Sequence, residues 1–118
     1  GYISVPILLL ATQLGGKKLD AFDIYLPHIY CIMGFKAVAR IPWIEKYKPG
    51  GWNKQLFKPY NNGEPDVLFM IYDPNYFENY KGNEGVMVKL NDSDKSYESA
   101  VSIQTCELDS ISNYEIRV

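Results

Sequence analysis

The sequence predicts a single α/β (α+β) domain over residues 1–118, with a mixed, mostly antiparallel sheet flanked by helices. Two observations predict this fold class. Helical and extended segments alternate along the chain, which is typical of layered folds that pack helices on a sheet. The apolar run 66–72 is nearly continuous, which is typical of a central strand covered on both faces. A chain of this length can bury roughly two-thirds of its unfolded surface, which is enough for one core.

The first segments predict a helix, a strand and a second helix. Residues 4–14 predict a buried helix, because their apolar run is too short to cross a bilayer and no basic leader precedes it. Residues 18–22 predict a short strand. Asp23 can cap the next helix, which carries Pro27 in its first turn and ends near Gly34. The core positions expected on that helix are its apolar residues Ile24, Ile29, Ile32 and Met33.

The remaining segments predict two further strands and a long helix around the central strand. Residues 36–44 predict a strand, and Pro42 places it near an edge or a bulge. Residues 45–65 form a long connection, in which 52–57 suits one helical turn. Residues 85–90 predict a weaker strand. A helix is expected from Ser96, its N-cap, to about Ile111, followed by a tail that is an edge strand or a frayed end. The core stripe expected on this helix is Tyr97, Ala100, Val101, Leu108 and Ile111.

The composition excludes several classes of protein. A net charge of −2 argues against a dedicated binder of duplex DNA, which usually carries a strong basic excess. Cys31 and Cys106 are too few for a disulfide framework, so a cytoplasmic location is expected. Cys31 lies in an apolar run and is predicted to be a buried free thiol. The single histidine, His28, is expected on an exposed helix face, and no metal site and no membrane association are expected.

Tyr30 is the first candidate for chemistry. It precedes Gly34 by one helical turn, so its hydroxyl is expected near the point where the helix gives way to a strand. A polar group at such a junction can present a proton donor to a substrate. The same position also suits a packing tyrosine on a core helix, and both interpretations stay open.

The pattern around Tyr30 resembles a known family. Residues 30–35 read Tyr-x-x-x-Gly-Phe, and residues 36–40 read Lys-x-Val-x-Arg. With a short strand before them and the strand 66–72 after them, they resemble the C-terminal half of the GCN5-related N-acetyltransferases (GNAT). Residues 19–23, 26–30 and 65–70 are also similar to acetyltransferase-like domains of phage and mobile-element proteins. The resemblance covers about half of the chain.

The resemblance implies acyl transfer from acetyl-CoA to an amine, in the host cytoplasm if the protein is phage-encoded. Tyr30 matches the family tyrosine that often protonates the thiolate of coenzyme A, and a phenol, with a reference pKa near ~10, is protonated at neutral pH. Asp23 falls where the family often has an asparagine that contacts the cofactor, although helix capping explains Asp23 equally well. The family's pyrophosphate loop, Gln/Arg-x-x-Gly-x-Gly/Ala, has no counterpart before residues 4–14. The upstream strands of the family fold are absent as well, so the N-terminal part of that fold is expected to be missing.

The segment 46–60 is the second candidate site. It carries four lysines and four aromatic residues and no acidic residue. Lysines can track phosphates while aromatic rings stack on bases, whereas the alternative is a surface loop whose rings pack on the domain. The residues proposed for substrate or partner binding are Trp52, Lys54, Phe57, Lys58 and Tyr60. In the family resemblance, the acceptor amine would lie near Trp52 and Tyr60.

An alternative function follows from the same segment. A non-catalytic binding or inhibitory module would use residues 46–60 to engage a protein or a single-stranded nucleic acid. The partner would be another protein or a second copy of the chain, and nucleic acid is less favoured because the net charge is negative.

Overall fold

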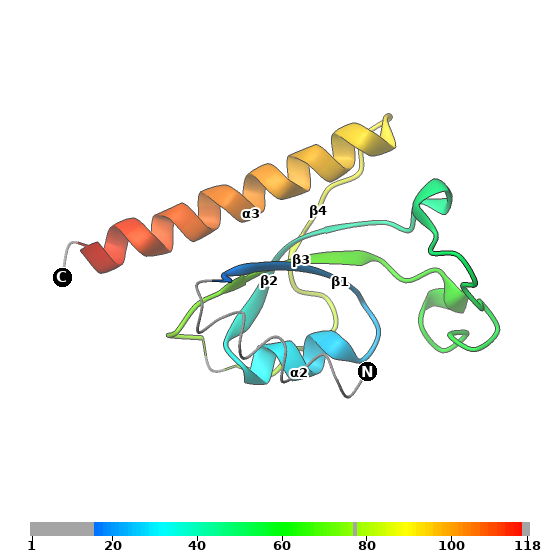
Figure 1. The fold of residues 1–118 in the computed structure, drawn as a ribbon, viewed down its shortest axis with the longest axis horizontal. Coiled ribbons are helices and arrows are strands. Elements are labelled where there is room, and N and C mark those ends of the chain that lie inside the picture. The colour runs from blue at the N-terminus through cyan, green and yellow to red at the C-terminus, as the bar shows by residue number, and fades with distance from the viewer. Residues whose placement is uncertain (1–15, 77, 117–118) are drawn as a thin grey trace.

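The computed structural model describes residues 16–76 and 78–116, with the backbone alone for residues 112–116. In this part of the chain a four-stranded mixed sheet lies between two helices, which confirms the predicted α+β class (Figure 1). The strands are β1 (Lys18–Phe22), β2 (Phe35–Ile41), β3 (Val67–Tyr72) and β4 (Val86–Met87), and the helices are α2 (Leu26–Ile32) and α3 (Ser93–Ile116). The helix predicted over residues 4–14 lies outside the described residues.

The order of the strands in the sheet is β1-β3-β2-β4. β3 pairs antiparallel with both β1 and β2, so the strand predicted to be central is central. β4 pairs parallel with β2 through only two residues, and the strand predicted over 85–90 is therefore much shorter than expected. The strand predicted over 36–44 ends at Ile41, just before Pro42, which has no N–H to offer a neighbouring strand.

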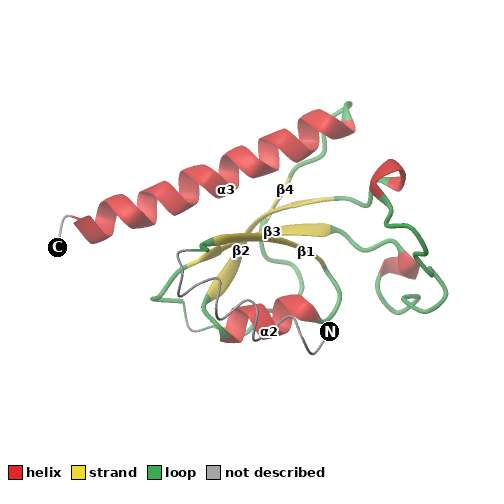
Figure 2. Ribbon diagram, viewed as in Figure 1, coloured by secondary structure: helices red, strands yellow, loops and turns green. Residues whose placement is uncertain are grey.

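The side chains of β3 alternate between two cores, because successive residues of a strand point to opposite faces. Leu68 and Met70 pack with Tyr30 and Cys31 of α2. Phe69 packs with Ala100 of α3 on the other face. Figure 2 shows α2 and α3 on opposite sides of the sheet, so the described part of the chain has three layers.

A β-bulge in β2 decides which residues face which helix. The pairing with β3 shifts between Ala37 and Ala39, so Val38 is the extra residue. Ala37 packs in the core beside α2, whereas Ala39 packs in the core beside α3. An uninterrupted strand would have put both alanines on one face. The bulge therefore turns Arg40, the partner of Leu68, toward the α2 side of the sheet.

Helix α2 ends as predicted but begins differently. Gly34 follows it with φ of +96°, a conformation that favours glycine, and a Cβ there would lie 2.9 Å from the Tyr72 ring. The N-cap residue is Tyr25, with no side-chain hydrogen bond, so the predicted capping by Asp23 is wrong. Ile32, predicted to be in the core, is 78% exposed, because it lies on the face of this short helix that points away from the sheet. Cys31 is buried as predicted, and burial raises the pKa of its thiol to about 11.

Helix α3 starts earlier than predicted. The Asp92 carboxylate accepts hydrogen bonds from the backbone N–H groups of Asp94 and Lys95, so Asp92 caps the helix. Ser96, the predicted cap, lies in the first turn instead, where its hydroxyl accepts a bond from the Leu90 N–H at 2.8 Å. The helix continues to Ile116, so the part of the tail that the structure describes is neither a strand nor frayed. None of the described helices combines the length and apolarity needed to cross a bilayer.

The connection from β2 to β3 is held together by its own contacts. It contains two one-turn 3-10 helices, Glu45–Tyr47 and Asn61–Gly63. Within the predicted turn 52–57, the Phe57 N–H donates to the Asn53 carbonyl at 3.4 Å, which closes one turn of the helical i to i+4 type. The Trp52 indole N–H donates to the Gly63 carbonyl at 2.9 Å and closes the loop. This connection is therefore an ordered surface element beside the end of β1 (Figure 2).

Candidate functional site

Tyr30 lies beside an open cavity. It is 8% exposed and belongs to the core between α2 and the sheet. A cavity of about 330 Å³, here called the Tyr30 cavity, is lined by Tyr30 together with Trp52, Phe57 and the β1 residues Asp20 and Phe22. Tyr30, Trp52 and Phe57 were predicted as site residues in two separate segments, and the structure brings these three together around one cavity.

An aromatic cluster forms the wall opposite α2. The Trp52 and Phe57 rings stack with centroids 4.5 Å apart, and the Phe22 ring is 4.9 Å from Trp52. Trp43 adds a fourth ring at 5.4 Å from Trp52. Rings at these separations attract one another through their edges and faces as well as through buried area. Trp52 and Phe57 thus pack on the domain while still facing the cavity, which combines the two interpretations left open by the sequence.

The lysines of the 46–60 segment are mostly paired. The Lys54 ammonium lies 3.2 Å from Glu45 Oε2 and 3.0 Å from Glu64 Oε2, and these carboxylates raise the pKa of Lys54. Glu45 also accepts a bond from the Trp43 indole N–H at 2.6 Å, and this bond, together with Lys54, lowers the pKa of Glu45 to about 2. Two lysines are among the predicted binding residues. Lys54 is paired, whereas Lys58 makes no ion pair with a residue that the structure describes.

Asp23 belongs to a buried ion cluster. Its carboxylate accepts a bond from Nη2 of Arg40 at 2.5 Å, and Asp66 accepts one from Nε of the same guanidinium at 3.0 Å. Nη2 also lies 3.0 Å from Asp66 Oδ2, as an ion pair. Arg40 is 8% exposed. Its Nη1 donates to the backbone carbonyls of Gly82 and Glu84 at 3.4 and 3.2 Å. Burial alone would lower the pKa of Arg40, but the bond to Asp23 and the charges around it raise that pKa.

This cluster has a structural consequence. A guanidinium carries five N–H donors, and four of those of Arg40 make hydrogen bonds within the protein. Arg40 therefore connects the start of β3, the approach to α2 and the 82–84 turn to one another. Its positive charge is already paired with the carboxylates of Asp23 and Asp66. Asp23, predicted as a cofactor contact, uses one carboxylate oxygen to hold Arg40.

Asp23 and Tyr60 line a second cavity, separate from the first. It measures about 420 Å³ and is also lined by Arg40, Asp66 and His28. His28 is exposed, as predicted, and its ring lies 5.0 Å from that of Tyr80. Tyr60 therefore does not share the Tyr30 cavity with Trp52. Within the described part of the chain, no group of histidine, cysteine and acidic side chains could hold a metal ion.

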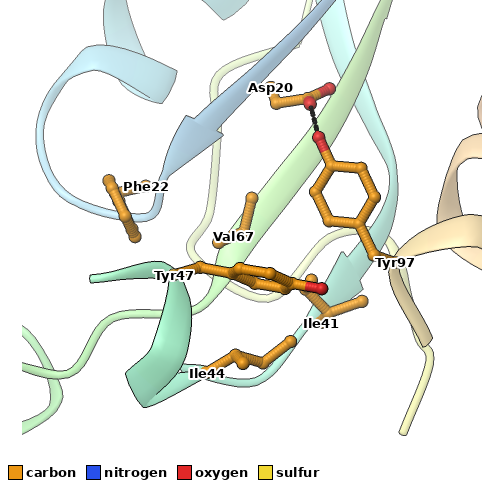
Figure 3. Close-up of a pocket in the computed structure, with 7 residues that line it drawn as sticks. All are labelled: Asp20, Phe22, Ile41, Ile44, Tyr47, Val67 and Tyr97. Atoms are coloured by element: carbon orange, nitrogen blue, oxygen red, sulfur yellow. Dashed lines mark hydrogen bonds between the residues drawn. The ribbon is translucent and has the colours of Figure 1, made fainter. Parts of the chain in front are cut away.

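A third cavity was not predicted from the sequence. It measures about 430 Å³, lies on the α3 side of the sheet and is called the Asp20 cavity here (Figure 3). The Tyr97 hydroxyl of α3 donates to Asp20 Oδ2 at 2.7 Å across its mouth, and this bond raises the pKa of Tyr97 to about 12. The other walls are Phe22, Ile41, Ile44, Tyr47 and Val67.

Strand alternation could have identified this cavity. In β1, Leu19 and Ala21 pack toward α2, so Asp20 between them must face the α3 side. Tyr97 was predicted as a core residue of the helix stripe, and its ring does pack on Phe69 at 5.2 Å. Neither observation gives the distance between the two residues, because that depends on how α3 crosses the sheet.

Comparisons with known proteins add no family assignment. No protein-family model, no curated protein and no solved structure matches the chain.

Proposed function

We propose that this domain is acyltransferase-like and that the Tyr30 cavity is the site where an acyl group passes to an amine. The observation that carries the proposal is the meeting of Tyr30, Trp52 and Phe57 on one open cavity. Tyr30 would act as the general acid of this site.

The donor side of the reaction is not built by the described residues. Acetyl-CoA carries a pyrophosphate, which proteins hold with cationic side chains or with several free backbone N–H groups. Among the described residues that line the Tyr30 cavity, Asp20 is the only charged one, and Arg40, which lines another cavity, is already paired with Asp23 and Asp66. These residues do not fit a pyrophosphate, so no catalytic step is assigned to coenzyme A.

Thermal unfolding of the full chain during titration with acetyl-CoA tests the proposal. A ligand at a hundred times its Kd adds about 2.7 kcal/mol to the free energy of unfolding, so Tm rises if acetyl-CoA binds. Phe57→Ala removes a cavity wall and should reduce the rise in Tm. Leu56→Ala is the matched control, because Leu56 is 68% exposed and does not line the cavity. An unchanged Tm at millimolar acetyl-CoA would contradict acyl transfer.

A second candidate is the non-catalytic module that engages a partner through residues 46–60. The ion pairs favour a protein partner over a nucleic acid, because Lys46, Lys48 and Lys54 are already paired with carboxylates. The exposed apolar side chains of Tyr47 and Leu56 also suit a protein surface.

Two measurements separate this second function from acyl transfer. If residues 46–60 bind a partner, native mass spectrometry should show a homo-oligomer or a bound protein. In thermal unfolding, acetyl-CoA should then leave Tm unchanged. Binding of a single-stranded oligonucleotide that weakens with salt and with Lys58→Gln would instead favour the nucleic-acid alternative.

A further inference from the structure

The Asp20 cavity has a simple chemical character. One carboxylate, Asp20, lies at its mouth, and its remaining walls are aliphatic or aromatic. Its volume of about 430 Å³ falls in the range of small-molecule sites. No lysine or arginine is among its lining residues in the described part of the chain, so an anionic ligand would meet only repulsion.

The Asp20 carboxylate is held in place and still has room for a ligand. Tyr97 donates to Oδ2 at 2.7 Å, and the Gln104 side-chain amide lies 3.4 Å from Oδ1. Tyr97 and Gln104 are seven residues apart, two turns along the same face of α3. A carboxylate can accept about four hydrogen bonds, so acceptor sites remain on both oxygens. These contacts fix the direction of the carboxylate without using up its capacity.

The charge favours one class of ligand. An ammonium group can donate to a single carboxylate oxygen, whereas the bidentate mode of a guanidinium needs both oxygens open on one side. A metal ion would need more ligands than this one acid. The rings of Tyr47 and Tyr97 stand 6.0 Å apart edge to face, and aromatic faces also attract a cation.

We propose that the Asp20 cavity binds a small alkyl or arylalkyl ammonium compound, with its charged group on Asp20 and its apolar body between Phe22, Ile44 and Tyr97. This binding does not depend on acyl transfer, and it concerns the α3 side of the sheet rather than the Tyr30 cavity. The two cavities share Asp20 and Phe22 at the edge strand β1. A test must therefore distinguish binding at the two cavities through substitutions of residues that line only one of them.

Calorimetric titration of the full chain with phenethylammonium and with the neutral analogue 2-phenylethanol tests the proposal. The ammonium compound should bind about tenfold or more tightly than the alcohol. Asp20→Asn should abolish this difference and leave the weak binding of the alcohol unchanged. Asp109→Asn, at an exposed position of α3, is the matched control and should behave like the unaltered protein.

Two further variants locate the bound compound. Ile44→Trp fills the Asp20 cavity and should remove binding of both compounds, whereas Phe57→Leu changes only the Tyr30 cavity and should leave both affinities unchanged. The reverse pattern would overturn the proposal, as would equal affinities for the ammonium compound and the alcohol. Absence of heat up to about 10 mM ligand would also overturn it, because even a millimolar Kd is then detectable. If Asp20→Asn does not fold, the Ile44→Trp and Phe57→Leu pair decides alone.

Discussion

The Tyr97 hydroxyl of α3 donates a hydrogen bond of 2.7 Å to Asp20 of β1, a residue 77 positions earlier in the chain. This bond ties the long helix to the edge strand of the sheet. Gln104 adds a second tie two turns later, where its amide donates to the backbone carbonyls of Leu19 and Met70 at 3.0 Å. Polar side chains of α3 therefore help to fix its position over the sheet, together with its apolar stripe.

The Tyr97–Asp20 bond predicts how stability responds to alkaline pH. The pKa of Tyr97 rises from 10.0 to about 12 in the folded protein, first through the bond to Asp20 and then through burial. Burial also raises the pKa of Tyr76 to about 12. The unfolded chain thus loses these protons first, so the stabilisation is complete below pH 10 and is lost as the pH rises toward 12.

Urea unfolding across this interval checks the prediction. The free energy of unfolding should fall steadily above pH 10, and Tyr97→Phe should make the fall shallower. Tyr25→Phe is the control, because that ring is 48% exposed and its loss should leave the pH profile unchanged. A profile for Tyr97→Phe that matches the unaltered protein would contradict the assigned role of the bond.

Arg40 should be among the most sensitive positions in the protein. Replacement by methionine leaves two largely buried carboxylates, Asp23 and Asp66, without their cation, together with two carbonyls without a donor. Removal of one partner from a buried ion cluster typically costs about 3–5 kcal/mol. Lys36→Met is the matched control, since Lys36 makes one ion pair, at 3.2 Å to Asp73, and should cost about 1 kcal/mol or less. Urea unfolding measures both values, and equal losses for the two variants would refute the role given to Arg40.

The stability of the loop between β2 and β3 should depend on Gly63. Its φ is +81°, and an added Cβ would lie 2.3 Å from the Lys54 carbonyl oxygen. Gly63→Ala should therefore lower the free energy of unfolding by about 2–4 kcal/mol, through backbone strain and overlap. Gly50→Ala lies in the same loop with open space around it and should change stability by less than about 1 kcal/mol. Thermal and urea unfolding of Gly63→Ala and Gly50→Ala test whether the loop adopts this conformation.

Local signals in the sequence predicted much of the fold. The Gly34 stop, Pro27 in the first turn of α2 and the apolar run of β3 each act through their own backbone or their own burial. Ser96 was predicted as the cap of α3, but Asp92 caps it, and the pattern does not distinguish them because both residue types cap helices.

The parts that the sequence did not predict are those set by contacts between distant segments. The bulge at Val38 changes the face of every later residue in β2, and no turn residue marks it. In the sequence, Arg40 is part of the pattern that resembles a family, and the structure pairs it with Asp23, Asp66 and two backbone carbonyls. Tyr60 was grouped with Trp52 because both lie in one segment, and the loop directs them to different cavities. The distance in space between two residues of a folded loop does not follow from their spacing in the sequence.

Mass-spectrometric detection of acetylated product tests the central claim most directly. The full chain is incubated with acetyl-CoA and a panel of primary amines, and Tyr30→Phe, which keeps the ring and removes the hydroxyl, is run beside it. The account predicts product with the unaltered chain and a rate about a hundredfold or more lower with Tyr30→Phe, the usual contribution of a general acid. Equal rates for the two proteins, or no product from any amine, would contradict the assignment of the Tyr30 cavity as the reaction site.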